Sequence, residues 1–175
     1  GSAIPKLYGS FTPTVRWKSL SLSVLCTYSL GGKVYDSNYA DLMSVSNNPQ
    51  NYSRDVLKSW KAAPEGMTAT SPDRMWYGGI PQINSTTSKE NNATSSRWLT
   101  SANYLVIKNV NLAYQLAKAW IRALELESVR LSVTAENLAT FTARRGMNPQ
   151  QSFNGTQYNY LVTPRVFTIG LDVKF

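Results

Sequence analysis

The chain has 175 residues, enough for about one domain, and carries a formal net charge of +8. Only 16% of its residues are charged and 11% are aromatic, a composition that suits many strands and long polar loops. The charge is dispersed, since the segment 32–102 holds seven Lys and Arg against six Asp and Glu. Nucleic-acid-binding proteins usually concentrate positive charge on one face or helix, so the sequence argues against nucleic acid as a partner.

The residue types that the chain lacks narrow its chemistry. It has no histidine and one cysteine, Cys26. An internal disulfide, Ser-His-Asp or Cys-His catalytic machinery and a histidine-based metal site are therefore excluded. Glu125 and Glu127 come nearest to a carboxylate pair, but no acid–base partner accompanies them. We predict no enzymatic activity and no catalytic, cofactor-binding or metal-binding residue.

No apolar run approaches the ~20 residues of a membrane helix, and no signal peptide is visible. A membrane role would therefore have to be carried by strands. The missing signal peptide suggests that the chain begins within a longer protein.

The first regular segments form a predicted antiparallel hairpin. Residues 8–18 alternate apolar and polar side chains, although Pro13 lacks an N–H group and suggests a bulge or a strand end. After a short turn at Ser19, residues 20–30 alternate more cleanly. Cys26 falls on the apolar face of this second strand, where we interpret it as a small, inert hydrophobic residue.

A long segment, 32–102, shows no sustained alternation and is rich in Asn, Ser, Thr, Pro and Gly. One short helix is predicted inside it, with Ser53 as its cap and Asp55 in its first turn. An irregular segment of this length is unusual inside a compact soluble domain. It is expected of an extracellular loop in an outer-membrane barrel.

Alternation returns at Tyr104, but Leu105 and Ile107 have the opposite parity to Val110 and Leu112. We therefore predict a β-bulge near Lys108 or Asn109. One or two helical turns are expected within 117–126, followed by a strand over 129–136. A second loop, about 139–163, leads to the last alternating segment.

The last segment, 165–175, alternates over its whole length. It resembles the terminal strand of an outer-membrane β-barrel, in which alternating apolar residues and a final Phe form a signal for the assembly machinery. Its apolar residues, the predicted assembly signal, are Phe167, Ile169, Leu171, Val173 and Phe175.

The connections between the five predicted strands alternate between short and long, which is typical of a membrane barrel. About eight strands are the practical minimum for closure, so five form part of a larger one. We therefore predict an all-β fold, an antiparallel transmembrane β-barrel segment with extracellular loops at about 32–102 and 139–163. Leu20, Leu22, Val24, Tyr28, Leu112, Leu131, Ile169 and Leu171 are expected to face outward, and Ser21, Ser23, Asn111, Ser132 and Thr168 inward.

Six further features occur in order along the chain: Lys6–Phe11, Leu22–Asp36, Ser96–Leu99, Tyr104–Tyr114, Glu136–Leu138 with Phe141-Thr142, and Pro164-Arg165 through Val173–Phe175. Together they resemble the C-terminal end of TonB-dependent outer-membrane transporters of the SusC/RagA type, across essentially the whole of residues 1–175. Two departures are Ala117, where a Pro is common, and Asn148-Pro149-Gln150, where Asp-Pro-Glu is commoner.

The resemblance implies a 22-stranded barrel with an N-terminal plug and a TonB box, neither of which this chain contains. It implies a SusD-like lipoprotein lid as partner, and TonB as a second partner that acts through the missing N-terminal region. The expected function is uptake of large nutrients, glycans and in some members peptides. The expected location is the outer membrane of a Gram-negative, Bacteroidetes-like bacterium, where lipid, the assembly machinery and the rest of the barrel surround the chain.

Aromatic residues of the long loop are the candidates for contact with a substrate or the lid, although packing within the loop is the favoured interpretation. Charged residues on the inward faces, namely Arg16, Lys108, Arg130, Glu136 and Asp172, are expected to pair with one another. The loop candidates are Trp60, Trp76, Tyr77 and Trp98.

Two other classes of protein remain as alternatives. A soluble all-β carbohydrate-binding module would use the loop aromatics as its platform, and a plug and TonB box encoded upstream would exclude it. A secreted glycoprotein is supported only by matches to the N-glycosylation pattern at Asn51, Asn84, Asn92 and Asn154.

Overall fold

The computed structural model describes residues 1–45, 50–59, 80–81, 88–152, 154–158 and 163–175. The chain divides into two compact units, which are considered separately. The first consists of residues 1–34 and 100–175, and the second of residues 35–99.

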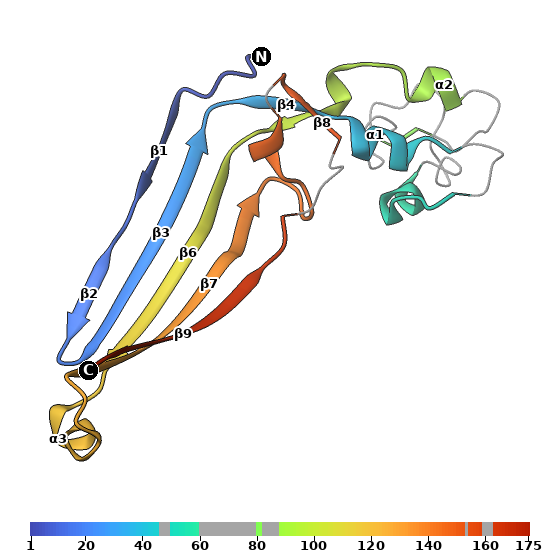
Figure 1. The fold of residues 1–175 in the computed structure, drawn as a ribbon. Coiled ribbons are helices and arrows are strands. Elements are labelled where there is room, and N and C mark those ends of the chain that lie inside the picture. The colour runs from blue at the N-terminus through green and yellow to red at the C-terminus, as the bar shows by residue number, and fades with distance from the viewer. Residues whose placement is uncertain (46–49, 60–79, 82–87, 153, 159–162) are drawn as a thin grey trace, which may run out of the picture. The chain divides into compact units, whose positions relative to one another are not determined.

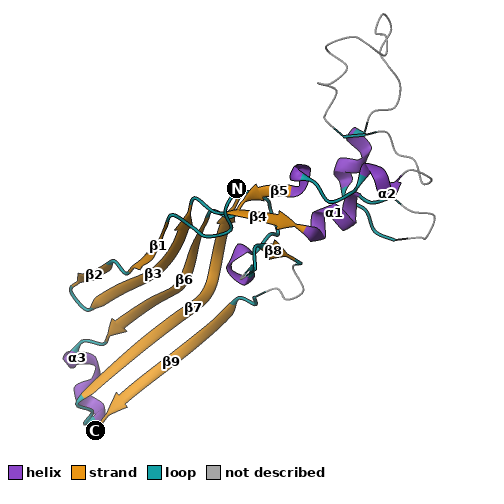
Figure 2. Ribbon diagram, turned by 90° about the horizontal axis from the view of Figure 1, so that it is seen from above, coloured by secondary structure: helices purple, strands orange, loops and turns teal. Residues whose placement is uncertain are grey.

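The first unit is built on one antiparallel sheet (Figures 1 and 2). Its strand order is β1-β3-β6-β7-β9, with β2 also paired to β3. The all-β prediction is therefore confirmed, and the predicted 8–18 strand is divided into β1 and β2 around Pro13. The strands are β1 (Leu7–Phe11), β2 (Thr14–Trp17), β3 (Leu20–Leu30), β6 (Tyr104–Gln115), β7 (Ser128–Thr142) and β9 (Val166–Lys174).

The register of these strands separates apolar from polar side chains across the whole sheet. One cross-strand row is entirely apolar: Val15, Leu22, Leu112, Val133 and Ile169. The adjacent row points to the opposite face, because successive side chains of a strand alternate. It is entirely polar: Thr14, Ser23, Asn111, Thr134 and Thr168.

The polar row is linked by side-chain hydrogen bonds. The amide of Asn111 donates to Thr134 Oγ1 at 2.7 Å, and Thr14 Oγ1 donates to Ser23 Oγ at 3.3 Å. The side chains of the apolar row are not covered by other parts of the described chain, and all five are exposed. One face of the sheet therefore carries polar side chains that hydrogen-bond to one another in this row, while the other carries exposed hydrophobic side chains.

A β-bulge in β6 keeps this separation intact. The register shifts between Ile107 and Asn109, leaving Lys108 as the extra residue. Beyond the shift, Ile107 lies opposite Cys26, and Leu105 lies opposite Tyr28. The bulge thus returns Ile107 and Leu105 to the apolar face, which confirms the prediction made from their parity.

A second irregularity lies at the same level in β7. Here Glu136 pairs with Asn109 and Ala139 with Ile107, so two residues of β7 face one of β6. Asn137 takes a left-handed backbone with φ 52°, which Asn tolerates better than most residues. Its side-chain amide donates to the carbonyl oxygen of Pro164 at 3.2 Å, just before β9.

The strand β7 continues to Thr142, three residues past the point at which the second loop was expected to begin. The irregularity at Asn137 is the physical reason. Asn137 and Leu138 interrupt the alternation there, whereas Ala139 and Phe141 have the same odd-numbered parity as Val133 and lie on the apolar face, opposite Ile107 and Leu105. Unbroken alternation in the sequence ends at Glu136, so the pattern does not predict that β7 continues to Thr142.

The second unit folds around its own small core. Buried Ala40 and Met43 on α1 (Ser37–Met43) pack with Val56 on the 3-10 helix η1 (Arg54–Lys58) and with Trp98. Asp36 caps α1 by accepting from the N–H of Tyr39 at 3.0 Å. Among the described residues of this unit, the remaining helices are α2 (Ser88–Asn91) and η3 (Ser96–Trp98).

The short helix expected after Ser53 is present as η1. Ser53 Oγ accepts from the N–H of Asp55 at 3.2 Å, as a cap should. The predicted helical turns within 117–126 are also present, as α3 (Lys118–Ile121) and η4 (Arg122–Leu124). Among the described residues, no helix has the length and apolar character needed to cross a membrane.

Three short strands complete the regular structure. They pair in the order β5-β4-β8. One more 3-10 helix lies between β7 and β8. These elements are β4 (Lys33–Asp36), β5 (Leu99–Ser101), η5 (Pro149–Gln151) and β8 (Thr156–Gln157).

Substitution of Asn137 tests its two roles separately. Asn137→Gly keeps the left-handed backbone but loses the hydrogen bond to Pro164, which stabilises by about 0.5–1.5 kcal/mol. Asn137→Val loses both, and the strained backbone costs about 1–2 kcal/mol more. We expect urea unfolding of the intact protein to rank wild type above Gly and Gly above Val. Equal stability of the two variants would mean that the left-handed backbone is not what selects Asn here.

Candidate functional site

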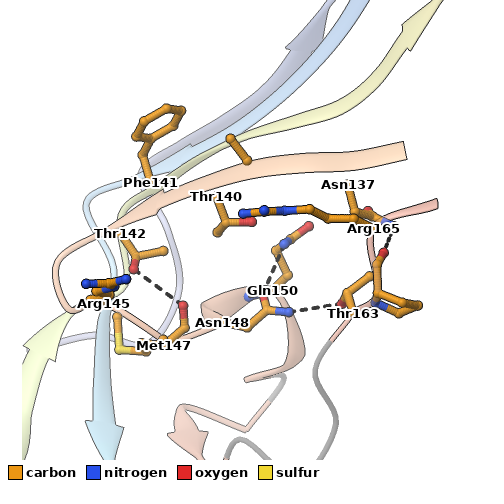
Figure 3. Close-up of a pocket in the computed structure, with 13 residues that line it drawn as sticks. Asn137, Thr140, Phe141, Thr142, Arg145, Met147, Asn148, Gln150, Thr163 and Arg165 are labelled. Atoms are coloured by element: carbon orange, nitrogen blue, oxygen red, sulfur yellow. Dashed lines mark hydrogen bonds between the residues drawn. The ribbon is translucent and has the colours of Figure 1, made fainter. Parts of the chain in front are cut away.

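A pocket of about 780 Å³ lies at the end of β7 in the first unit (Figure 3). Its walls come from three segments: the last residues of β7, the turn that follows, and the residues that lead into β9. The lining residues are Asn137, 139–142, 145–148, Gln150 and 163–165.

Hydrogen bonds from a few side chains hold these walls together. Thr142 Oγ1 donates to the carbonyl oxygen of Arg144 at 2.7 Å and so fixes the turn. Asn148 Oδ1 accepts from the backbone N–H of Gln150 at 3.3 Å and from its side-chain amide at 3.0 Å. The amide of Asn148 donates to Thr163 Oγ1 at 3.3 Å. Asn148 therefore joins the turn to the segment before β9.

The local sequence explains this arrangement. Asn is a favoured N-cap, and proline is favoured in the first turn because its missing N–H needs no partner there. Asn148 and Pro149 occupy these positions at the start of η5. Pro149 and Met147 are buried, which anchors the turn and leaves the neighbouring polar side chains to line the pocket.

The pocket is positively charged. Arg145 and Arg165 both line it, both are exposed, and neither has a hydrogen-bonding or ion-pair partner among the described residues. Arg165 extends along β7 towards Thr140, and Arg145 lies beside Thr142 (Figure 3). No lining residue is acidic, and the whole segment 137–165 contains three arginines and no Asp or Glu.

This arrangement suits an anionic ligand. A guanidinium presents a planar fork of N–H donors that binds carboxylates and similar oxyanions through two parallel hydrogen bonds. Hydroxyl and amide groups of Thr140, Thr142 and Gln150 lie around the two arginines. The sequence does not bring Arg145 and Arg165 together, because they lie twenty positions apart. The absence of acidic residues over 137–165 is the sequence feature that could have indicated an anion-binding site here.

Trp98 packs within the second unit and is not exposed for stacking on a substrate. Its side chain is 1% exposed, and its ring meets that of Tyr39 edge-on at a centroid distance of 6.0 Å. Its indole N–H donates to the carbonyl oxygen of Ala93 at 3.1 Å. For Trp98 the structure therefore agrees with the favoured interpretation, packing within the loop, and not with the alternative of a substrate or lid contact.

Arg97 covers the Trp98 ring, with its guanidinium carbon 4.5 Å from the ring centroid. Burial lowers the pKa of Arg97 from its ordinary value. Tyr39 also donates its hydroxyl to Asp55 Oδ2 at 2.9 Å, which links α1 to η1. The other three aromatic candidates, Trp60, Trp76 and Tyr77, lie outside the described residues.

The apolar residues of the predicted assembly signal form one face of β9 and continue to Phe175. Ile169 lies directly opposite Val133, and Leu171 opposite Leu131. All of these β9 side chains are exposed in this chain: Phe167, Ile169, Leu171, Val173 and Phe175. Their role in assembly stays a prediction.

The inward charges do not form the expected ion pairs. Arg130 and Asp172 lie directly opposite each other on β7 and β9, yet the structure has no ion pair between them. None joins the other described members of the set, Arg16, Lys108 and Glu136, either. The described loop residues do contain an ion pair, Lys58 with Asp55 at 2.7 Å, and the hydrogen bond to Asp55 raises the pKa of Lys58. Among the described residues, no cluster of three or more His, Cys, Asp or Glu offers a metal site.

Comparisons with known proteins agree with this two-faced sheet. The chain is 26% identical over 186 aligned residues to TonB-dependent receptor P3 of Formosa agariphila, covering 100% of this chain and 17% of that receptor. No family model matches. A solved structure of the RagAB peptide transporter matches with a TM-score of 0.67 at 19% identity, covering 99% of this chain and 18% of that one. The RagAB peptide importer in its open-open state gives 0.66 at 20% identity, with the same coverage.

The sheet is therefore an unclosed segment of an antiparallel β-barrel, with one apolar and one polar face. The chain is thus similar in sequence to part of a TonB-dependent receptor, and it shares its fold with part of the RagAB structures. It spans less than a fifth of the length of the relatives that it matches.

Truncation of the buried indole should loosen the second unit alone. We expect Trp98→Ala to cost about 3–5 kcal/mol, as for other buried aromatic side chains, and to expose residues 35–99 to limited proteolysis. Leu57→Ala is the matched control, since Leu57 belongs to the same unit but is 72% exposed. Equal protease resistance of the two variants would show that the Trp98 core does not hold this unit together.

Proposed function

We propose that this chain is the C-terminal part of the barrel of a transporter that imports large nutrients across the outer membrane. The observation that carries the proposal is the separation of apolar and polar side chains onto opposite faces of the sheet, which is complete in the rows through Leu112 and Asn111. A sheet face of hydrophobic side chains, many of them exposed, suits lipid, and a face with hydrogen-bonded polar side chains suits a water-filled lumen.

We propose a 22-stranded barrel from the family resemblance, and the topology supports a barrel with more strands than this chain supplies. The two edges of the sheet, β9 and the β1–β2 side, have no second partner strand among the described residues. Unpaired edges are unfavourable in lipid, because the free N–H and C=O groups find no water there. We infer that the remaining strands of the same barrel pair with both edges.

The long connections lie at one end of the strands and the short ones at the other. We propose that the segments around 32–102 and 139–163 are extracellular and that the turn containing α3 is periplasmic, as in outer-membrane barrels. A loop unit with its own buried core, as residues 35–99 have, is suited to contact with a SusD-like lipoprotein lid. The unplaced aromatics Trp60, Trp76 and Tyr77 remain candidates for that contact or for substrate.

The partners and cargo that we propose for this transporter are based on its similarity to TonB-dependent receptors. We propose that TonB supplies energy through an N-terminal plug region outside this chain, and that the cargo is glycan or peptide. RagAB is described as a peptide importer, which favours oligomeric nutrients in general. The alternating apolar residues of β9, from Phe167 to Phe175, are proposed to be recognised by the outer-membrane assembly machinery.

A pair of substitutions on β9 tests which face meets lipid. Ile169 and Thr168 are neighbours on opposite faces. Ile169→Arg should cost about 2–4 kcal/mol near the bilayer midplane and sharply lower the amount of full-length protein in the outer membrane. Thr168→Arg should leave that amount nearly unchanged, because its side chain faces the lumen. The opposite result would reverse the assignment of the two faces.

A second experiment tests the transport role. Tagged full-length protein extracted from its native outer membrane in mild detergent should retain a lipoprotein partner, and loss of TonB should abolish uptake of its cargo. A full-length protein that is a water-soluble monomer and unfolds cooperatively would exclude a barrel and restore the soluble carbohydrate-binding alternative.

A further inference from the structure

We propose that the pocket at the end of β7 is a subsite for the anionic groups of an acidic oligosaccharide, carboxylate or sulfate ester. The proposal deepens the proposed function, on which it rests, by naming the chemical class of the cargo. It is carried by the two unpaired arginines and by the side chains around them.

The first argument is charge. Arg145 and Arg165 enter the same pocket from segments twenty positions apart in sequence, and no acidic side chain lines it. Two like charges in one pocket repel each other unless a counter-charge lies between them. Neither arginine has such a partner among the described residues. An anionic ligand would supply the missing counter-charge.

The second argument concerns space and hydrogen bonding. The volume, about 780 Å³, lies within the range of about 300–1,000 Å³ typical of small-molecule sites. Six of the thirteen lining residues carry a hydroxyl or an amide. Such groups both donate and accept hydrogen bonds, which matches the hydroxyl groups of a sugar ring.

The same lining favours an oligosaccharide over an acidic peptide. Extended peptides are commonly bound by strand addition, in which their backbone N–H and C=O groups pair with a free sheet edge. This pocket instead presents side chains, such as Thr140 and Gln150, from the end of β7 and from the turn. An acidic peptide is therefore the competing ligand in the test.

The probes separate the sources of the negative charge. Purified full-length transporter in detergent would be titrated calorimetrically with an oligogalacturonate, which carries carboxylates, and with a carrageenan oligosaccharide, which carries sulfate esters. A maltooligosaccharide serves as the neutral probe and an oligoglutamate as the acidic peptide. We expect one or both acidic oligosaccharides to bind more tightly than the neutral one, and binding to weaken as salt is added.

The variants remove or oppose the charge without altering the fold. R145Q/R165Q should weaken binding of the acidic oligosaccharide at least tenfold, or about 1.4 kcal/mol. T140D adds a negative charge at a lining residue that takes no part in the hydrogen bonds that hold the pocket walls together, so it should weaken binding in the same direction. R122Q is the matched control, because Arg122 lies on η4 and not in the pocket.

Three outcomes overturn the inference. The first is unchanged affinity of R145Q/R165Q in protein that is folded like wild type. The second is equal affinity for neutral and acidic sugars. The third is arginine-dependent binding of oligoglutamate alone, which would make the site a peptide site. None of these results affects membrane location, TonB dependence or retention of a lipoprotein, so failure of the inference is distinguishable from failure of the proposed function.

Discussion

The structure depends on one constraint, the register that keeps apolar and polar side chains on opposite faces of the sheet. A slip by one residue in any strand would move its whole apolar set to the polar face. The two irregularities, at Lys108 in β6 and at Asn137 in β7, lie at the same level of the sheet. The first shifts the parity of β6 so that Ile107 and Leu105 lie on the apolar face, and the second sets two residues of β7 opposite the extra residue of β6. They are therefore part of the pattern and not interruptions of it.

The second irregularity also shapes the pocket. The carbonyl of Pro164, which accepts from the Asn137 amide, directly precedes Arg165. The strand irregularity at Asn137 therefore also anchors the segment that carries Arg165. Thr140 and Thr142 line the pocket because β7 extends past Asn137. The barrel register and the site chemistry are connected through this short stretch of chain.

The strands and the bulge near Lys108 were predictable from sequence because alternation with period two is a direct signature of a half-covered sheet. The left-handed residue at Asn137 was not, since a polar residue at an apolar position followed by an apolar residue at a polar position, Asn137 and Leu138, resembles the end of a strand. Trp98 was named as a candidate contact, and its burial depends on Tyr39 and Met43, more than fifty residues earlier. The pocket forms because the fold brings Arg145 and Arg165 to the same site. Proximity between residues so far apart along the chain leaves no local pattern in the sequence.

The loop unit with Trp98 at its centre has a wider consequence. Surface loops usually vary freely in sequence and length, and the cost of closing a longer loop rises only slowly. Residues 35–99 have an internal hydrophobic core, so the limits on their variation come from inside the loop. Evolution can therefore rebuild the exposed surface of this unit, including its length, as long as a few interior contacts persist. The register of the sheet and the core of residues 35–99 therefore set separate limits on how the sequence can change.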